Sequence, residues 1–234
     1  MKAIILAGGK GTRLKPFTTN FPKPLMPVGD KPILEILLMS LKKAGIKDII
    51  ITTGHLSEMI RLFFEDGSKF GLNISYSIED KPLGTAGPIK LQLNNLNEHF
   101  LLMNGDVLTD LNFSEFIEFH QNNKNDVTIG SVFREQYIDF GIVELDNDKN
   151  YTGWNEKPTL TYLVSMGMYL FSPDILEHLP ESDFFTAPEL ISVLEKKGKK
   201  IMGYTHKGYW LDIGRPEDYE KACNDFTSNK TYKK

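Results

Sequence analysis

The sequence predicts an α/β protein with a doubly wound, three-layer αβα (Rossmann-like) mixed sheet, and two observations support this prediction. Short β-branched runs alternate with amphipathic helical segments through the first half of the 234-residue chain, and strand-like segments follow one another in the second half. Alternating strands and helices favour a parallel sheet with helices on both faces. In such a sheet, ligands bind at the carboxyl ends of the strands.

The first half is expected to contain these elements in alternating order. We expect strands at Ala3–Leu6, Asp48–Thr52, Ile74–Ile78 and Phe100–Met103, and helices at Ile33–Ala44, Ser57–Phe64 and Ile89–Leu96. Pro32 stands at the start of the first helix and Gly45 just beyond its end, and these residue types favour a helix start and a helix stop. Functional side chains are therefore expected after Leu6 and after Met103.

The pattern changes after Asp126. Strand-like segments with short polar connections, which permit antiparallel pairing, occur at Val127–Phe133, Ile142–Leu145 and Leu163–Phe171. They are followed by a helix at Ala187–Lys196, a strand at Ile201–Tyr204 and a helix from Pro216 to about Phe226. Because no Gly/Ser-rich linker divides the chain, we expect one domain over residues 1–226, with halves at about 1–125 and 126–226, and a flexible tail at 227–234.

Composition and charge limit the functional class. The net charge of −4 provides no basic surface for nucleic acid, and the single cysteine, Cys223, cannot form an internal disulfide, which fits a reducing cytoplasm. The first apolar run stops at Gly8, too early for a signal peptide, and no run reaches the ~20 apolar residues that cross a bilayer. We therefore expect a cytoplasmic protein that binds neither nucleic acid nor membrane.

The strongest local motif directly follows the first expected strand and reads Leu6-Ala7-Gly8-Gly9-Lys10-Gly11-Thr12-Arg13-Leu14-Lys15. Its three glycines let the backbone approach a phosphate, and Arg13 adds a fork of donors for phosphate oxygens. The motif is not a P-loop, because it lacks a Gly-Lys-Ser/Thr ending, and Leu14 stands where a dinucleotide fingerprint needs its third glycine. A phosphate cradle is the favoured interpretation, and a simple tight turn is the alternative.

Three more charged residues fit a phosphate site. Lys23 lies between Pro22 and Pro24, which fix the backbone around it, so Lys23 and Arg13 are expected to converge on a triphosphate. Asp106 follows an apolar strand, and a carboxylate at that strand end suits Mg²⁺. Asp212 is a second candidate ligand, although it is also placed near enough to the last helix to cap it.

A further charged pair lies in the second half, at Glu156 and Lys157. A glutamate accepts hydrogen bonds from sugar hydroxyls, and a neighbouring lysine neutralises a phosphate on the anomeric carbon. The alternative is an exposed hairpin ion pair without function. The five histidines show neither metal-ligand spacing nor a Ser–His–Asp order.

Taken together, these motifs resemble the sugar-1-phosphate nucleotidylyltransferase family over essentially the whole chain. Six of them occur in the family's order: Gly8–Leu14, Pro22–Pro24, Pro82–Gly87, Gly105–Asp106, Glu156–Pro158 and Trp210–Gly214. The resemblance implies a glycosyltransferase-A-like fold with a small sugar-binding lobe, an NTP-binding first half, Mg²⁺ dependence and release of pyrophosphate. It is closest to short members that carry no β-helix or regulatory domain.

The resemblance also implies roles for residues at matching positions. Arg13 and Lys23 are expected to be catalytic, stabilising charge on the triphosphate, and Asp106 and Asp212 to hold Mg²⁺. The nucleotide-binding positions are Leu6, Ala7, Gly8, Gly9, Gly11, Thr12, Glu79, Pro82, Gly84, Thr85, Asn104 and Gly105. The positions for the sugar phosphate are Gly141, Glu156, Lys157, Ser165 and Gly167. Ser165 departs from the asparagine of many relatives, so the sugar is expected to differ from a common hexose.

The expected substrates are an NTP and a sugar 1-phosphate. Residues 83–88 look most like the loop of GDP-mannose-type guanylyltransferases, which favours GTP with a mannose- or heptose-1-phosphate-like partner, and Glu79 is suited to accept hydrogen bonds from guanine. The attacking phosphate is already an anion, so no general base is expected. The alternatives are a cytidylyl- or uridylyltransferase for another phosphorylated sugar or alcohol, and a non-catalytic nucleotide-sugar-binding regulatory subunit. A homo-oligomer is compatible with the sequence.

Overall fold

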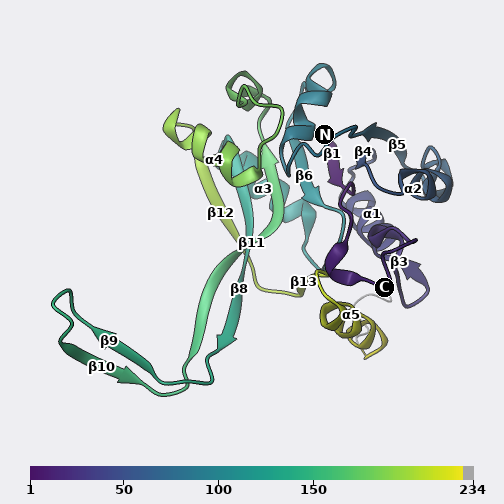
Figure 1. The fold of residues 1–234 in the computed structure, drawn as a ribbon. Coiled ribbons are helices and arrows are strands. Elements are labelled where there is room, and N and C mark those ends of the chain that lie inside the picture. The colour runs from purple at the N-terminus through teal and green to yellow at the C-terminus, as the bar shows by residue number, and fades with distance from the viewer. Residues whose placement is uncertain (229–234) are drawn as a thin grey trace.

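The computed structural model describes residues 1–228 and shows a three-layer α/β fold built on one large sheet (Figure 1). Within these residues the sheet has seven strands, in the spatial order β12 (Ile201–His206), β8 (Val127–Tyr137), β11 (Thr159–Phe171), β6 (Phe100–Asn104), β1 (Lys2–Leu6), β4 (Asp48–Thr53) and β5 (Asn73–Ile78). Strands β6, β1, β4 and β5 are parallel, whereas β11 is antiparallel to both of its neighbours. The predicted mixed sheet is confirmed.

Helices cover both faces of this sheet because the residues of each central strand alternate between two cores. Ala3 and Ile5 of β1 pack with one layer of helices, and Ile4 packs with the other. The first layer contains α1 (Ile33–Lys43), α2 (Ser57–Phe64) and α3 (Phe113–Asn122). The second contains α4 (Ala187–Lys196) with the 3₁₀ helices η4 (Gly87–Asn95) and η5 (Pro173–His178). The doubly wound arrangement follows directly from this alternation.

Helix α3 is an element that the sequence analysis missed. It begins after Asn112, whose side chain accepts hydrogen bonds from the backbone N–H groups of Ser114 and Glu115 at 3.1 and 3.4 Å. Its cap was readable, because asparagine is a preferred cap and a glutamate three residues later strengthens the signal. The segment 89–96, for which a helix was expected, forms the 3₁₀ helix η4 instead.

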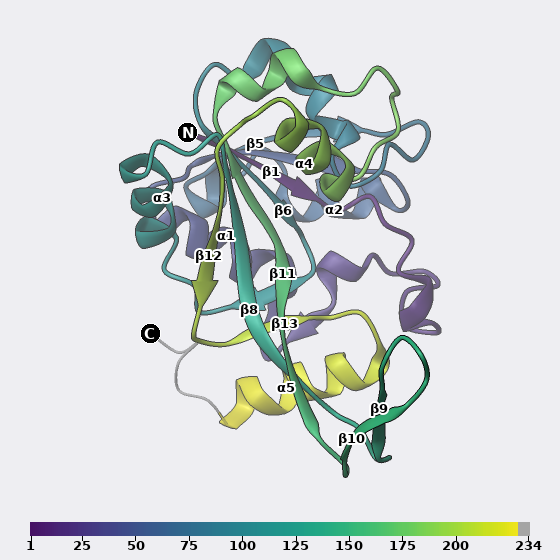
Figure 2. The ribbon, with the colours of Figure 1, turned by 90° about the vertical axis from the view of Figure 1, so that its left-hand side faces the viewer.

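The second half of the chain is divided between the main sheet and a projecting segment. Strands β8, β11 and β12 are part of the main sheet, because their inner residues continue its hydrophobic core. Residues 133–163, which we call the arm, leave the body as a two-stranded ribbon that carries the hairpin of β9 (Ile142–Leu145) and β10 (Tyr151–Asn155) at its tip (Figures 1 and 2). The sequence prediction ended β8 and began β11 several residues too close to the body.

Several short elements and helix α5 pack together around Leu14, near the end of the glycine loop. They are the 3₁₀ helices η1 (Thr12–Leu14) and η2 (Lys23–Leu25), the pair β2 (Pro27–Val28) and β3 (Lys31–Pro32), the pair β7 (Val107–Thr109) and β13 (Trp210–Asp212), and α5 (Pro216–Ser228). The remaining 3₁₀ helix, η3 (Ser68–Phe70), follows α2. A third cluster, which includes Leu14, Leu108 and Leu211, joins these pieces. They therefore form one support for the residues around the loop.

Helix α5 also changes the prediction for the C-terminal tail. The helix extends to Ser228, two residues past its predicted end at about Phe226, and residues 229–234 of the expected tail lie outside the described part of the chain. Among residues 1–228, no helix combines the length and the hydropathy that a membrane span requires.

Candidate active site

The glycine loop and Asp106 emerge side by side from neighbouring strands. Strand β1 lies between β4 and β6, with Leu6 in register with Thr52 on one side and Asn104 on the other. The strand ends are tied together, since Ala7 N donates to Thr52 O and Gly105 N donates to Leu6 O, each at 2.9 Å. The loop and the residues after β6 therefore share the carboxyl edge of the parallel strands, where ligands bind in such sheets.

Gly11 and Gly9 of the loop are glycines for different structural reasons. Gly11 adopts a left-handed conformation, with φ of 59°, and a Cβ there would lie 3.0 Å from the Thr18 side chain. Thr18 Oγ1 donates to Gly11 O at 2.7 Å and holds that turn. Gly9, in contrast, faces open space, with no atom within 4 Å of a Cβ position in the described chain. The backbone at Gly9 is therefore open to close approach by a ligand.

Lys23 and Asp106 form a partly buried ion pair beside this loop. The Lys23 side chain is only 10% exposed, and its Nζ donates to Asp106 Oδ2. The other carboxylate oxygen, Asp106 Oδ1, is buried and has no hydrogen-bond partner among residues 1–228. A buried carboxylate oxygen without a partner is costly, so this atom marks a place for a ligand that supplies positive charge or a donor.

Asp212 reaches the same place from the other end of the chain. Strand β13 pairs with β7 so that Asp212 lies in register with Val107, and Ile213 N donates to Asp106 O at 3.1 Å. Burial raises the pKa of the Asp212 carboxyl, and the Asp106 charge raises it further, whereas Lys23 and Arg13 lower it. Two carboxylates are thus held close together.

Arg13 completes the charged cluster. A Cβ built on Gly214 would lie 3.6 Å from Asp212 Oδ2 and 3.7 Å from Arg13 Nη1, so both side chains reach the same glycine, and Arg13 is near enough to lower the pKa of Asp212. The structure therefore brings together Arg13, Lys23, Asp106 and Asp212, which the sequence analysis selected from four separate motifs. Within residues 1–228 the Asp212 side chain makes no hydrogen bond to the start of α5, where Asp218 Oδ2 instead accepts from the N–H groups of Gly214 and Arg215.

The donor set fits Mg²⁺ on two grounds. Both side chains supply carboxylate oxygens, and one oxygen of Asp106 is buried without a partner. No cluster of three or more His, Cys, Asp or Glu residues that suits a metal occurs in residues 1–228, so two protein carboxylates are what this site offers. Mg²⁺ is commonly bound by one or two carboxylates together with water and substrate phosphates.

Three of these charged groups, Arg13, Lys23 and Asp106, line a pocket of about 200 Å³. Its walls are Leu6, Ala7, Gly9, Gly11, Thr12, Arg13, Lys23, Pro24, Asp106 and Gly214. A larger cavity, about 1220 Å³, lies between α1 and the start of α3, but none of the residues lining it was selected from the sequence. The smaller pocket is the candidate active site because it collects the cations, a carboxylate and the open glycine backbone.

Glu79 lies next to the glycine loop on the side away from Asp212. Its Oε1 is 3.1 Å from a Cβ position on Gly8, and its Oε2 accepts from Leu83 N at 3.2 Å. A second pocket of about 190 Å³ adjoins it, with Glu79, Leu83 and Lys90 among the lining residues. Contact of this carboxylate with the base of a nucleotide remains a prediction.

The loop around Gly84 has structural partners of its own. Gly84 has a φ of 81°, and a Cβ there would lie 2.4 Å from the Phe185 carbonyl oxygen. Thr85 Oγ1 accepts from Ala187 N at 2.9 Å, at the start of α4, and Pro82 lies exposed in the same loop. Nucleotide contacts by Pro82, Gly84 and Thr85 remain predictions, and these packing contacts alone account for the glycine and the threonine.

Two of the residues expected to contact the sugar lie in the bulge of β11. Gly167 has a φ of 69°, and a Cβ there would lie 2.6 Å from Asn104 Nδ2, so this glycine packs directly on Asn104. The Ser165 hydroxyl accepts from Gly167 N at 3.2 Å and lies 3.0 Å from the Tyr169 hydroxyl. The Ser165 hydroxyl therefore makes hydrogen bonds within the bulge itself. Gly167, in contrast, packs on Asn104 and so lies at the end of β6.

The other three sugar candidates lie on the arm. Trp154 Nε1 donates to Glu156 Oε2 at 2.8 Å, and the indole ring lies only 2.3 Å from a Cβ position on Gly141. Lys157 has a φ of 45° and pairs with Asp139 at 3.3 Å, instead of pairing with Glu156. None of Gly141, Glu156 and Lys157 is among the described residues that line the 200 Å³ pocket. The structure therefore places these three sugar candidates together on the arm, apart from Ser165 and Gly167 in the bulge of β11 and apart from the cations of the pocket.

Comparison with known proteins decides the family. A family model described as nucleotidyl transferase matches residues 2–229. The chain belongs to the nucleotidyl transferase family. Mannose-1-phosphate guanylyltransferase of Mycobacterium tuberculosis is 35% identical over 95% of this chain and 64% of its own length. UTP–glucose-1-phosphate uridylyltransferase of Synechocystis sp. is 32% identical over 98% of this chain and 64% of its own length.

A solved structure extends the comparison to the fold. HddC from Yersinia pseudotuberculosis matches with a TM-score of 0.75 at 31% identity, covering 96% of this chain and 99% of that chain. The same protein has been solved in complex with GMP-PN. This nucleotidyl transferase chain spans just under two thirds of the length of the two sequence relatives, and 99% of HddC.

Three residues of this nucleotidyl transferase that the sequence analysis did not select stand beside the candidates. Trp154 packs on Gly141 and bonds Glu156, and Asp139 holds Lys157. Trp210 donates from Nε1 to Met166 O at 3.1 Å, which ties β13 to the bulge of β11. Trp154 was readable two residues before Glu156, whereas the partners of Asp139 and Trp210 lie 18 and 44 residues away and leave no local signal.

Proposed function

We propose that this chain is a sugar-1-phosphate nucleotidylyltransferase, which forms a nucleotide sugar and pyrophosphate from an NTP and a sugar 1-phosphate. The observation that carries the proposal is the convergence of Arg13, Lys23, Asp106 and Asp212 beside an open glycine backbone. Cations and open N–H groups suit a triphosphate, and paired carboxylates suit the metal that accompanies it. Membership of the nucleotidyl transferase family supports the same reaction.

In this proposal, the chain works by positioning and charge neutralisation. An oxygen of the sugar phosphate forms a bond to the α-phosphorus as the bond from that phosphorus to the bridging oxygen of the β-phosphate breaks. Pyrophosphate leaves with the electron pair, and Arg13 and Lys23 stabilise the charge that develops there. The sugar phosphate is already an anion, so the chain supplies no base. Asp106 and Asp212 would hold Mg²⁺, which supplies further positive charge to the phosphates when bound.

The same proposal favours GTP and a mannose- or heptose-type sugar 1-phosphate. The 35% identical guanylyltransferase and the HddC complex with GMP-PN support guanine, and Glu79 beside Gly8 supplies a carboxylate for guanine's adjacent donors. The 32% identical uridylyltransferase makes UTP with a glucose-type partner the competing pair.

A panel of nucleotides tests base and reaction together. Pyrophosphate release is measured with GTP, ATP, UTP and CTP against mannose 1-phosphate and glucose 1-phosphate. We expect the highest kcat/KM with GTP, and we expect Glu79→Gln to lower the preference for GTP over UTP by about tenfold or more, since a lost charged hydrogen bond is worth roughly 1.5–3 kcal/mol. Glu58→Gln, on the exposed side of α2, is the matched control. A preference for UTP or CTP, or an unchanged preference in Glu79→Gln, would contradict guanine selection.

A further inference from the structure

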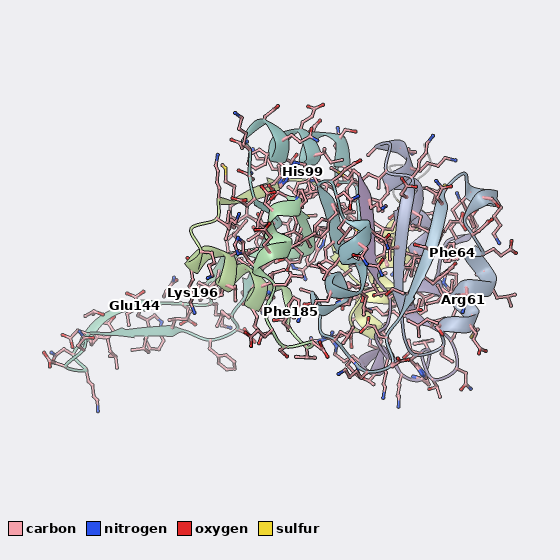
Figure 3. All side chains as sticks on the ribbon, turned by 90° about the horizontal axis from the view of Figure 1, so that it is seen from above. Arg61, Phe64, His99, Glu144, Phe185 and Lys196 are labelled. Carbon is pink, nitrogen blue, oxygen red and sulfur yellow. The ribbon has the colours of Figure 1, made fainter. Side chains whose placement is uncertain are left out.

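The arm is a direct continuation of two strands of the central sheet. Strands β8 and β11 stay paired from Ser131 opposite Ser165 out to Tyr137 opposite Thr159. The inner residues of both strands are buried, and the outer residues are exposed. Figure 1 shows the arm projecting away from β13 and α5, and Figure 3 shows Glu144 on the arm standing clear of the body. The direction of the arm is therefore set by the sheet and by the bulge after Ser165.

The arm exposes ordered apolar faces. On the stalk, Phe133 lies opposite Leu163, and Tyr137 follows on the same face. At the tip, Val143 lies opposite Trp154 and Leu145 lies opposite Tyr151, again on one face. These seven side chains are between 49% and 66% exposed. A two-stranded ribbon is marginally stable alone in water, so a ribbon with uncovered apolar faces is expected to be covered in the working protein.

The position of the sugar candidates points to what covers the arm. Gly141, Glu156 and Lys157 lie at the joint between stalk and tip, where Ile138 N donates to Pro158 O at 3.0 Å. The paired stalk holds this joint away from the body, and none of the three residues is among the described residues that line the pocket of the same chain (Figures 1 and 2). A partner chain that uses these three residues must have a pocket like the one at Arg13 and Asp106, and it must itself lack residues for the sugar phosphate at that pocket. A second copy of this chain fits that description.

We propose that the arm of one chain docks on a second copy and carries Gly141, Glu156 and Lys157 to the pocket of that copy. The inference rests on the proposed function, because it assigns the sugar half of that site to the partner. Exchange of the two arms makes a closed twofold dimer with two composite sites. Each site then takes its NTP half from one chain and its sugar-phosphate half from the other.

The apolar surface of the arm is sufficient for such a dimer. At roughly 100 Å² of exposed area for each of the seven side chains, the arm offers on the order of 700 Å². Stable interfaces bury about 800 Å² on each partner, so the arm and the surface it covers reach the usual size. The Trp154 indole, 58% exposed and adjoining Glu156, is placed to anchor the contact next to the sugar half.

Mixing two inactive variants tests the composite site. Arg13→Ala removes a cation from the NTP half, and Lys157→Ala removes the cation of the arm, so each protein alone is expected to be inactive. After subunit exchange, half of the dimers are mixed, and one of their two sites has both lysine and arginine. Activity per chain should recover to about a quarter of the wild-type value. A mixture no more active than its separate components, beside an active wild type, would overturn the inference. An inactive wild type would instead overturn the proposed function.

A measurement of mass tests the dimer without activity. Sedimentation is expected to give the wild-type chain at twice the mass of one chain, and Tyr151→Ser, at the tip and distant from Lys157 along the arm, is expected to shift it toward the monomer. Glu144→Gln, on the opposite face of the same hairpin, is the matched control and should stay dimeric. A monomeric wild type, or a Tyr151→Ser protein as dimeric as Glu144→Gln, would contradict docking through this face. Circular dichroism confirms that both variants are folded.

Discussion

Replacing Asp106 by asparagine is expected to lower kcat on the order of 10³-fold. The amide keeps the shape of the side chain but removes its negative charge. That charge pairs with Lys23 through Oδ2, and the other carboxylate oxygen, Oδ1, is buried without a partner among the described residues. Loss of one preorganised electrostatic group in an active site typically costs 10²–10³-fold in kcat, and this residue serves both a cation and the proposed metal. Steady-state rates across a Mg²⁺ titration measure the effect.

The same variant should also need more Mg²⁺ for half-maximal rate. Asp174→Asn is the control, since Asp174 is exposed at the start of η5 and lines neither the 200 Å³ pocket nor the pocket beside Glu79. Thermal unfolding of both variants separates a loss of activity from a loss of folded protein. Wild-type kcat and Mg²⁺ dependence in folded Asp106→Asn would show that the reaction needs Asp106 neither as a metal ligand nor as the partner of Lys23.

Replacing Arg13 by alanine is expected to lower kcat by roughly 10²–10³-fold with a much smaller change in the KM for the NTP. The guanidinium lies beside Asp212 at the edge of the pocket, where charge develops as pyrophosphate departs. A group that acts more strongly on the transition state than on the bound substrate changes kcat more than KM. Initial rates over a range of NTP concentrations at saturating sugar 1-phosphate separate the two constants.

A second substitution at this position refines the prediction. Arg13→Lys keeps a positive charge but loses the planar fork of donors, so it should recover only part of the rate. Arg61→Ala is the control, because Arg61 lies over the Tyr76 ring outside the pocket and should leave kcat unchanged. An Arg13→Ala enzyme with wild-type kcat and only a raised KM would assign Arg13 to nucleotide binding alone.

The central part of the site was predictable because strand order determines it. The glycine loop and Asp106 each follow an apolar strand, and the carboxyl ends of parallel neighbours lie together. Lys23 was predictable from the prolines around it, of which Pro22 caps η2 and Pro24 lies within it. Asp212 is different, since only pairing of β13 with β7 brings it to Asp106, and the sequence alone left capping of the last helix as an equal alternative for it.

The arm was not predictable from the sequence. Its strands have ordinary strand residues, and nothing local shows that the outer half of β8, from Phe133 to Tyr137, leaves the core that covers the inner half. Cross-strand pairs determine which face is apolar, and these depend on the register of two strands more than 20 residues apart. The position of Lys157 relative to Arg13 is a property of the assembled fold.

The fate of the individual phosphates of GTP tests the proposed reaction most directly. GTP labelled at the α- or the γ-phosphate is incubated with mannose 1-phosphate, Mg²⁺ and the wild-type chain, and the products are separated. Attack on the α-phosphorus predicts that the α label enters the nucleotide sugar while an equal amount of γ label appears as pyrophosphate. Release of the γ label as inorganic phosphate, its transfer to the sugar, or no turnover with any sugar 1-phosphate would contradict the proposed function.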